Sequence, residues 1–214
     1  LCSMKKTINI DTWKRKEHYN FFKDFQEPFF GITANVDCTT AYNYAKENNL
    51  SFFLYYMYQS LAAVNAIEEF GYRIEGNEVM SYDRIHCSTT AMNANGLFAF
   101  AFLRYTDNFE DYYAQAQEEI EKIKVIKTMN LNEDNARPDV IHYSTIPWIS
   151  FTSVSNERNL GKPDSIPKLT FGKYFKEGGK LLLPLHVNAH HALMDGYHVG
   201  KYFEIFQKLL DGNK

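Results

Sequence analysis

Three of the seven histidines in the 214-residue sequence lie within the segment NAHHALMDGYHVG, residues 188–200. The adjacent pair His190 and His191 is followed, four residues after the second histidine, by Asp195. The segment comes directly after the apolar run LLLPL (181–185), which is typical of a buried strand. Side chains of these types could pack, bind a metal ion, or supply a general base with a supporting carboxylate.

Neighbouring residues of a strand face opposite sides, so at most one of the two histidines can face a given cavity, and the other can pack. A zinc site is disfavoured, because the segment lacks the i,i+4 histidine pair of a metal-binding helix and has no Cys or Glu in ligand spacing. An imidazole titrates near neutral pH and is a natural general base when its other nitrogen is held. The residues thus favour catalysis over metal binding and leave packing open.

The composition limits the class of protein. Hydrophobic residues make up 45% and charged residues 23% of the chain, while the 16% aromatic content suits a wide core or an apolar ligand tunnel. A net charge of −3 predicts no nucleic-acid surface. Three widely spaced cysteines predict no disulfide framework and favour a reducing, cytoplasmic location. We expect no membrane association, because no apolar run nears the roughly 18 residues of a span and no signal peptide precedes Met4.

Helical and strand patterns are mixed along the chain without a repeat or linker, which predicts a single domain over residues 1–214. The patterns predict helices over 11–25, 38–49, 51–70, 108–130 and 198–212. They predict strands over 31–37, 72–76, 78–92, 96–106, 148–154, 168–175 and 180–190. We therefore expect an α/β fold with a two-layer architecture, in which a mixed β-sheet packs against helices.

Four blocks of the sequence resemble one known family. The segment HHALMDGYHVGKYF (190–203) resembles the signature of the chloramphenicol acetyltransferase family, in which HH, three free residues, DG, an aromatic residue and HV recur. The other blocks are DTWKRKEHYNFF (11–22), PWISFTS (147–153) and LTFGKYF…GGKLLLPL (169–185), which resemble family segments in the same order. The likeness spans nearly the whole chain and implies a coenzyme A-dependent acyltransferase fold.

The resemblance implies that acetyl-coenzyme A (acetyl-CoA) acetylates an acceptor hydroxyl without a covalent acyl-enzyme and without a metal. His191 would then be the general base, oriented partly by its own backbone carbonyl, and Ser153 would donate a hydrogen bond to the oxyanion. Asp195 would form an ion pair with Arg15 that holds the catalytic segment. Thr170 would assist through an ordered water molecule.

The resemblance also implies where the substrates bind. Lys173 and Tyr174 would contact the nucleotide part of coenzyme A, and Phe22 and Phe30 would lie in the acceptor site. The family forms homotrimers with sites between subunits. His191 would approach from one subunit and most acceptor-binding residues from its neighbour.

The departures from the family pattern concern the acceptor. Phe22 stands where chloramphenicol-modifying members carry a tyrosine, and NERNLGKPDSIPKL (156–169) is polar where the family is aromatic. These differences favour weaker binding of chloramphenicol, or a related acceptor or acyl group. Dihydrolipoamide acyltransferase cores and peptide-synthetase condensation domains share the HHxxxDG pattern, but no lipoyl segment precedes this core. A non-catalytic trimeric drug-binding protein is the alternative from another class.

Overall fold

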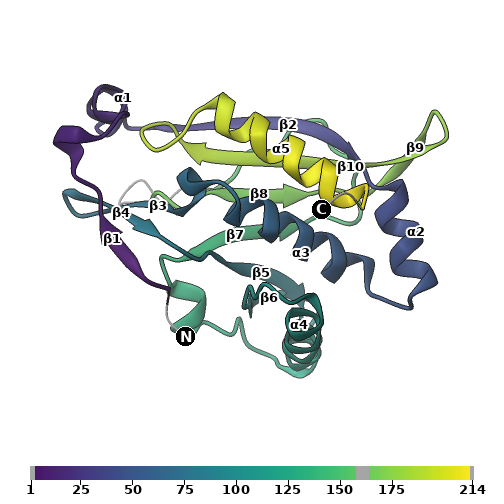
Figure 1. Ribbon diagram of the computed structural model, residues 1–214. Helices are drawn as coiled ribbons and strands as arrows, with labels where there is room; N and C mark the ends of the chain where they lie inside the picture. Colours follow the sequence, from purple (N-terminus) through teal and green to yellow (C-terminus); the bar gives the residue numbers. More distant parts are fainter. Residues whose placement is uncertain (1–2, 158–163, 213–214) are drawn as a thin grey trace.

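A computed structural model describes residues 3–157 and 164–212 of the chain (Figure 1). Its α-helices are α1 (Lys16–Phe22), α2 (Thr39–Glu47), α3 (Phe52–Asn65), α4 (Phe109–Val125) and α5 (Gly196–Leu210). Its short 3₁₀ helices are η1 (Ile10–Thr12), η2 (Glu68–Gly71) and η3 (Asp134–Ala136). Its strands are β1 (Lys5–Thr7), β2 (Phe29–Asp37), β3 (Tyr72–Glu75), β4 (Glu78–Tyr82), β5 (His86–Met92), β6 (Phe98–Leu103), β7 (Val140–Thr145), β8 (Lys168–Phe171), β9 (Phe175–Glu177) and β10 (Lys180–His190).

The strands form two sheets. The large sheet has the order β2-β10-β8-β7-β5-β6, and β9 also pairs with β10. Strand β7 is parallel to both of its neighbours, while the other pairs of this sheet are antiparallel. The small sheet, β1-β4-β3, is antiparallel. The expected α/β class with a mixed sheet packed against helices is confirmed.

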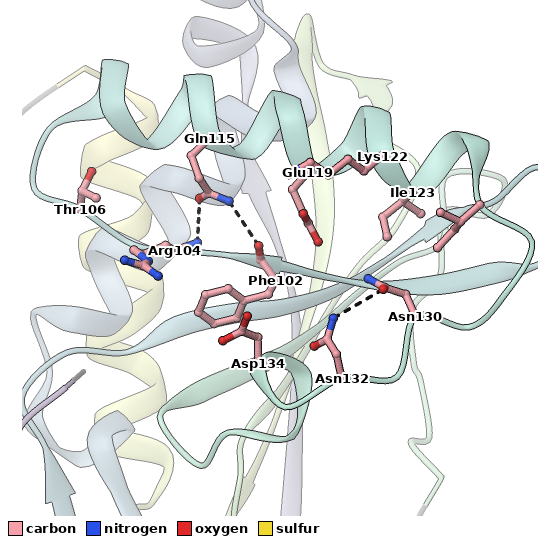
Figure 2. A pocket seen from close by; sticks show the side chains of 11 residues that line it. Phe102, Arg104, Thr106, Gln115, Glu119, Lys122, Ile123, Asn130, Asn132 and Asp134 are labelled. Atoms are coloured by element: carbon pink, nitrogen blue, oxygen red, sulfur yellow. Dashed lines mark hydrogen bonds between the residues drawn. The ribbon is translucent and has the colours of Figure 1, made fainter. Parts of the chain in front are cut away.

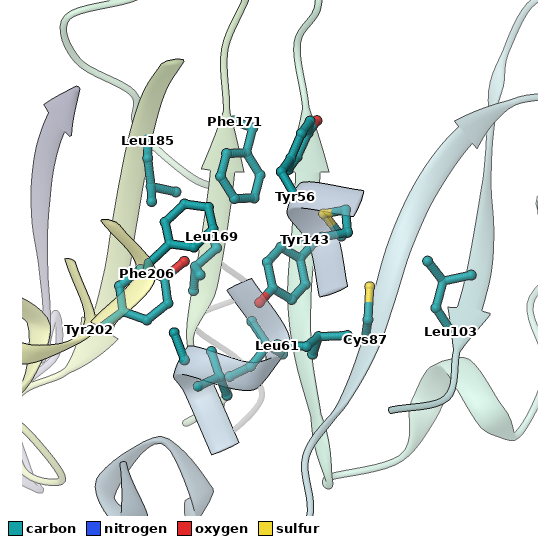
Figure 3. Packing of buried hydrophobic residues seen from close by; sticks show 14 of the residues in the cluster. Tyr56, Leu61, Cys87, Leu103, Tyr143, Leu169, Phe171, Leu185, Tyr202 and Phe206 are labelled. Carbon is teal, nitrogen blue, oxygen red and sulfur yellow. The ribbon is translucent and has the colours of Figure 1, made fainter. Parts of the chain in front are cut away.

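The two faces of the large sheet differ in chemistry. Alternate residues of β10 (Leu183, Leu185 and Val187) belong to the main core, and Figure 1 shows α3 and α5 crossing this face. Figure 3 shows aromatic rings and aliphatic side chains of these elements packed together in that core. Strand register places His186 and Asn188 of β10 on the other face, together with the residues level with them on the neighbouring strands. This face is largely polar and includes Thr33, Lys168, Thr170, His142, Ser144 and Ser88. The helices therefore cover one face of the sheet and leave polar side chains on the other.

The prediction of a strand over 148–154 is wrong. The chain turns after β7, where the Ile149 N–H donates to the Ile146 carbonyl (3.4 Å) and the Ile149 carbonyl accepts from the Lys173 N–H (2.8 Å). These bonds hold the segment to the end of β8 as a loop. The strand here is β7, which lies just before the predicted one and which we did not predict.

Several predicted boundaries also shift. The helix expected over 11–25 is reduced to η1 and α1, and the helix expected over 51–70 divides into α3 and η2. The strand expected over 78–92 divides between the small sheet and the large sheet. The last helix begins at Gly196 rather than at His198. It stops as expected before Gly212, whose φ of +81° suits a residue without a side chain.

Acid should destabilise the protein through the buried side chain of His86. Its exposed fraction is 2%, and burial lowers its pKa to about 4, so the native imidazole stays neutral while the unfolded chain takes up a proton near pH 6.5. The contribution is fully present above pH 6.5, and the free energy of unfolding falls by about 1.4 kcal/mol per pH unit for this proton as the pH decreases toward 4. Urea unfolding at successive pH values measures this slope. His86→Asn should make it shallower by about one proton, and an unchanged slope would contradict the assignment.

Candidate active site

The HHALMDG segment forms the junction between β10 and α5. Strand β10 ends at His190, whose carbonyl accepts hydrogen bonds from the Leu193 and Met194 N–H groups (3.0 and 3.2 Å). Asp195 then caps α5, because its Oδ1 accepts from the Tyr197 N–H (3.0 Å). The strand end and the helix N-terminus therefore hold both sides of a tight turn that contains His191.

The two adjacent histidines have different surroundings. His190 is 4% exposed, meets the Phe29 ring edge-on at 5.1 Å, and its Nδ1 accepts from the Ala192 N–H (3.3 Å). The His191 ring instead stacks on Phe22 at 4.1 Å with an interplanar angle of 4°, and lies 4.6 Å from the Phe30 ring. His190 thus packs, while His191 lies against aromatic walls.

The backbone and one ring nitrogen of His191 are enclosed. Its N–H donates to the Pro28 carbonyl (2.8 Å), and its carbonyl accepts from Nη2 of Arg15 (3.1 Å). Nδ1 is buried and has no hydrogen-bond partner among the described residues, so the expected hydrogen bond between this ring and the His191 carbonyl is not present. Nε2 is therefore the nitrogen that a substrate hydroxyl could reach.

Arg15 and Asp195 form the expected ion pair. Nη1 lies 2.7 Å from Oδ2, and the two side chains are 11% and 32% exposed. Burial alone would raise the pKa of Asp195, but the hydrogen bonds from Arg15 and from the Tyr197 N–H hold that pKa below its ordinary value. Arg15 also donates from Nε to the Ala192 carbonyl (3.4 Å). The ion pair thereby holds two consecutive carbonyls of the histidine turn.

Thr170 and Ser153 lie in another part of the fold. Thr170 is 1% exposed on β8, and its Oγ1 accepts from Nδ2 of Asn156 (3.5 Å). Ser153 is exposed, three residues before Asn156 in the loop that follows β7. Gly172 permits the close approach of this loop, because a Cβ there would lie 3.0 Å from the Ile149 carbonyl oxygen.

Lys173 and Tyr174 lie beyond the same end of β8. Lys173 is exposed, and its carbonyl accepts from Oγ of Ser150 (2.7 Å). The Tyr174 ring is 39% exposed and lies 5.3 Å from the Tyr42 ring and 6.0 Å from the Phe52 ring. A hydrogen bond with Tyr42 raises the pKa of Tyr174. An exposed cation beside an exposed aromatic ring could bind a nucleotide through its phosphates and base.

The chain therefore carries two separate groups of expected site residues. The histidine group comprises Arg15, Phe22, Phe30, His191 and Asp195, and the threonine group comprises Ser153, Thr170, Lys173 and Tyr174. Register pairs Thr170 with His186 of β10, which lies five residues before His191. Five residues of extended chain span roughly 16 Å. Phe175 pairs with Leu182, still further from His191. One copy of the chain does not bring the two groups together.

Two hollows of the described surface lie away from both groups. A groove of about 620 Å³ runs between α4, β6 and η3, where Gln115 accepts from the Arg104 N–H (2.9 Å) and donates to the Phe102 carbonyl (3.4 Å) (Figure 2). A second hollow, of about 610 Å³, lies between β1 and the end of α3. Neither is lined by an expected site residue. Within residues 3–157 and 164–212, no three His, Cys, Asp or Glu side chains are grouped to hold a metal ion.

Residues 4–207 match the family model described as chloramphenicol acetyltransferase, and the chain belongs to that family. A chloramphenicol acetyltransferase of Bacillus pumilus is 29% identical over 203 residues, which cover 94% of this chain and 91% of the relative. A solved chloramphenicol acetyltransferase structure is 32% identical, with a TM-score of 0.89, over 97% of this chain and 100% of that one. The resemblance drawn from the four sequence blocks is confirmed.

A wider set of structures shares the fold. The probable dihydrolipoamide acetyltransferase of Listeria monocytogenes is 16% identical with a TM-score of 0.67, and covers 92% of this chain and 89% of that one. At this identity the likeness concerns the fold alone. In the chain itself, none of the described helices is long and apolar enough to cross a membrane.

Two residues beside the site were missed from the sequence. His198 was considered only as a metal ligand, but it is the third residue of α5 and contacts both Asp195 and Glu69. An acid followed three residues later by a side chain with an acceptor atom is the spacing of a capping box, which was the available signal. Residues 158–163 of the polar acceptor segment lie outside the described residues.

Proposed function

We propose that the protein transfers the acetyl group of acetyl-CoA to a hydroxyl of chloramphenicol or a related small alcohol. The observation that carries this proposal is the placement of His191 in a member of the chloramphenicol acetyltransferase family. Its Nδ1 is enclosed, its Nε2 is accessible, its ring is held by Phe22 and Phe30, and its carbonyl is held by Arg15.

The reaction assigned to this site is a direct transfer. Nε2 of His191 removes the acceptor proton as the oxygen attacks the thioester carbonyl, which forms a tetrahedral intermediate. The Ser153 hydroxyl donates a hydrogen bond to its oxyanion, and Thr170 holds a water molecule beside it. Collapse of the intermediate breaks the carbon–sulfur bond, and the imidazolium returns the proton to the leaving thiolate. The products are the acetyl ester and free coenzyme A.

A second copy of the chain completes the site, in a homotrimer. The separation of the two groups along β10 supports this arrangement, because a base roughly 16 Å from Thr170 cannot act on the same carbon atom within one chain. The polar face of the large sheet, which carries Thr170, supplies hydrogen-bonding side chains for contact with a neighbour. Lys173 and Tyr174 contact the nucleotide of coenzyme A. The location is cytoplasmic, which the free thiols of Cys38 and Cys87 support.

An acceptor panel tests the function. We expect purified protein to release coenzyme A thiol from acetyl-CoA, measured with a thiol-trapping dye, when chloramphenicol is added. The KM for chloramphenicol should be high, because Phe22 and the polar segment 156–169 remove favourable contacts, and Phe22→Tyr should lower it. Turnover with other alcohols or acyl thioesters alone would identify another acceptor or donor. Chloramphenicol binding without thiol release from any pair would contradict the proposal and indicate a non-catalytic binder.

A further inference from the structure

His198 lies between two carboxylates beside the histidine turn. Its Nδ1 is 3.2 Å from the main-chain nitrogen of Asp195 and 3.0 Å from Oδ1 of that residue. Its Nε2 is 3.3 Å from Oε1 of Glu69, and the side chain is 13% exposed. Because the Asp195 N–H donates to Nδ1, the imidazole proton lies on Nε2 and points at the Glu69 carboxylate.

Glu69 is held on a well-anchored element. It lies in η2, where the Phe70 carbonyl accepts from Nη1 of the buried Arg73 (2.8 Å). A Cβ on Gly71 would lie 2.6 Å from the Tyr82 carbonyl oxygen, so η2 packs directly on β4. The hydrogen bond from His198 holds the pKa of Glu69 below its ordinary value. The carboxylate is therefore a fixed acceptor for His198.

The contacts continue from His198 to the catalytic turn. The Asp195 N–H donates to Nδ1 of His198, Oδ2 of Asp195 pairs with Arg15, and Arg15 donates to the His191 carbonyl. The line Glu69–His198–Asp195–Arg15 thus joins η2 to the backbone of His191. The Arg15–Asp195 ion pair forms one end of this line. Glu69 and His198 extend it to η2, which packs on β4 of the small sheet.

We propose that Glu69 and His198 are positioning residues, which act through Asp195 and Arg15 to hold the His191 backbone in place and thereby raise kcat. This inference rests on the proposed function. Without His198, the Asp195 N–H loses its acceptor, and the backbone that carries the Asp195 carboxylate is held less firmly. The guanidinium of Arg15 then no longer holds the His191 carbonyl in one place. A misplacement of about 1 Å at a reacting group can cost on the order of 10²-fold in rate.

Variants of His198 test the proposal by separating kcat from KM. We expect His198→Ala to lower kcat on the order of 10- to 100-fold. The KM for acetyl-CoA should not change, because the proposed nucleotide contacts come from Lys173 and Tyr174, which His198 does not touch. His198→Gln should restore most of the rate, since its amide can accept from the Asp195 N–H and donate to Glu69. Glu69→Ala should lower kcat, and Glu69→Gln, which keeps an acceptor oxygen, should lower it less.

Glu75 provides a matched control. It lies in β3, its side chain is 30% exposed against 27% for Glu69, and it bonds to Lys5 (2.8 Å) and to the Tyr82 hydroxyl, away from the histidine turn. The Tm and kcat of Glu75→Gln are measured beside those of the Glu69 variants, and its kcat should be unchanged. An equal loss of kcat at an equal loss of Tm would overturn the proposal, because it would show an effect of stability alone.

A spectroscopic measurement keeps the test independent of the acceptor. The His191 ring stacks on Phe22 at 4.1 Å, so its ring protons should have strong ring-current shifts in NMR spectra of histidine-labelled protein. These shifts should change in His198→Ala and return in His198→Gln. Unchanged shifts with kcat within twofold of the unmodified protein would overturn the inference. If the unmodified protein transfers no acetyl group, the proposed function fails, while the shifts still decide whether His198 positions His191.

Discussion

Replacement of His191 by glutamine should lower kcat by roughly 10²- to 10⁴-fold, because the acceptor hydroxyl loses its general base. Glutamine keeps a polar group of similar length beside Phe22 and Phe30, so the loss reports chemistry rather than packing. Coenzyme A binding should persist, since the proposed contacts to its nucleotide come from Lys173 and Tyr174 and not from His191. Steady-state kinetics with the best acceptor of the panel, together with calorimetric titration of coenzyme A, make the measurement.

The adjacent histidine supplies the matched control. His190→Asn keeps an acceptor near the position of Nδ1, which the Ala192 N–H uses. It should retain turnover within a few-fold of the unmodified protein, because the His190 ring packs against Phe29 and is buried. Equal losses of kcat in folded His190→Asn and His191→Gln would show that the base has been assigned to the wrong residue.

The sequence alone predicted the elements that carry the histidine turn. The apolar run over 181–185 is a local signal and β10 forms where it lies, whereas α5 begins two residues before the predicted helix. The strand expected over 148–154 failed for a physical reason. The apolar residues Trp148 and Ile149 are 66% and 59% exposed, so their apolar character does not mark a buried face in this chain. Periodicity records which residues are apolar but not whether a neighbouring element covers them.

The contacts around the base depend on tertiary structure. The stacking of Phe22 on His191 joins α1 to the far end of the chain, and no spacing within either segment predicts it. The same is true of Glu69, which precedes His198 by more than a hundred residues and meets it only because η2 packs beside α5. The family resemblance identified Arg15 and Asp195 because each lies inside one of the four sequence blocks that carry it. It supplied neither Glu69 nor its role.

The separation of the two residue groups also follows from register rather than from local pattern. Thr170 lies on β8 and His191 directly follows the neighbouring strand β10, so strand order alone would place them close together. Only the pairing of Thr170 with His186 shows that Thr170 lies level with a residue five positions before His191. That offset is the reason to expect a site made by two copies of the chain, and it leads to a test with a large signal.

Two inactive variants should restore activity when they assemble together. His191→Gln lacks the base, and Ser153→Ala lacks the oxyanion donor, whose loss typically costs about 10²- to 10³-fold. In mixed trimers, a site that takes His191 from one copy and Ser153 from the next is intact wherever the two variants meet in the right order. Random assembly of equal amounts should therefore give roughly one quarter of the activity of the unmodified protein.

The control is a chain that carries both substitutions, mixed with the unmodified protein. If His191 and Ser153 act from different copies, each needed side chain is present at half of the positions, and the mixture again gives roughly one quarter of full activity. If both act within one copy, this mixture gives about one half, and the two single variants together give only their own residual rates. Co-expression at equal amounts with two affinity tags gives the unselected mixture, whose thiol release separates these outcomes. Sequential purification then isolates the mixed trimers, in which the two single variants should give roughly one third of full activity. Activity that stays at the residual level in purified mixed trimers would mean that the site is not shared, and that Ser153 and Thr170 do not serve His191 of a neighbouring copy.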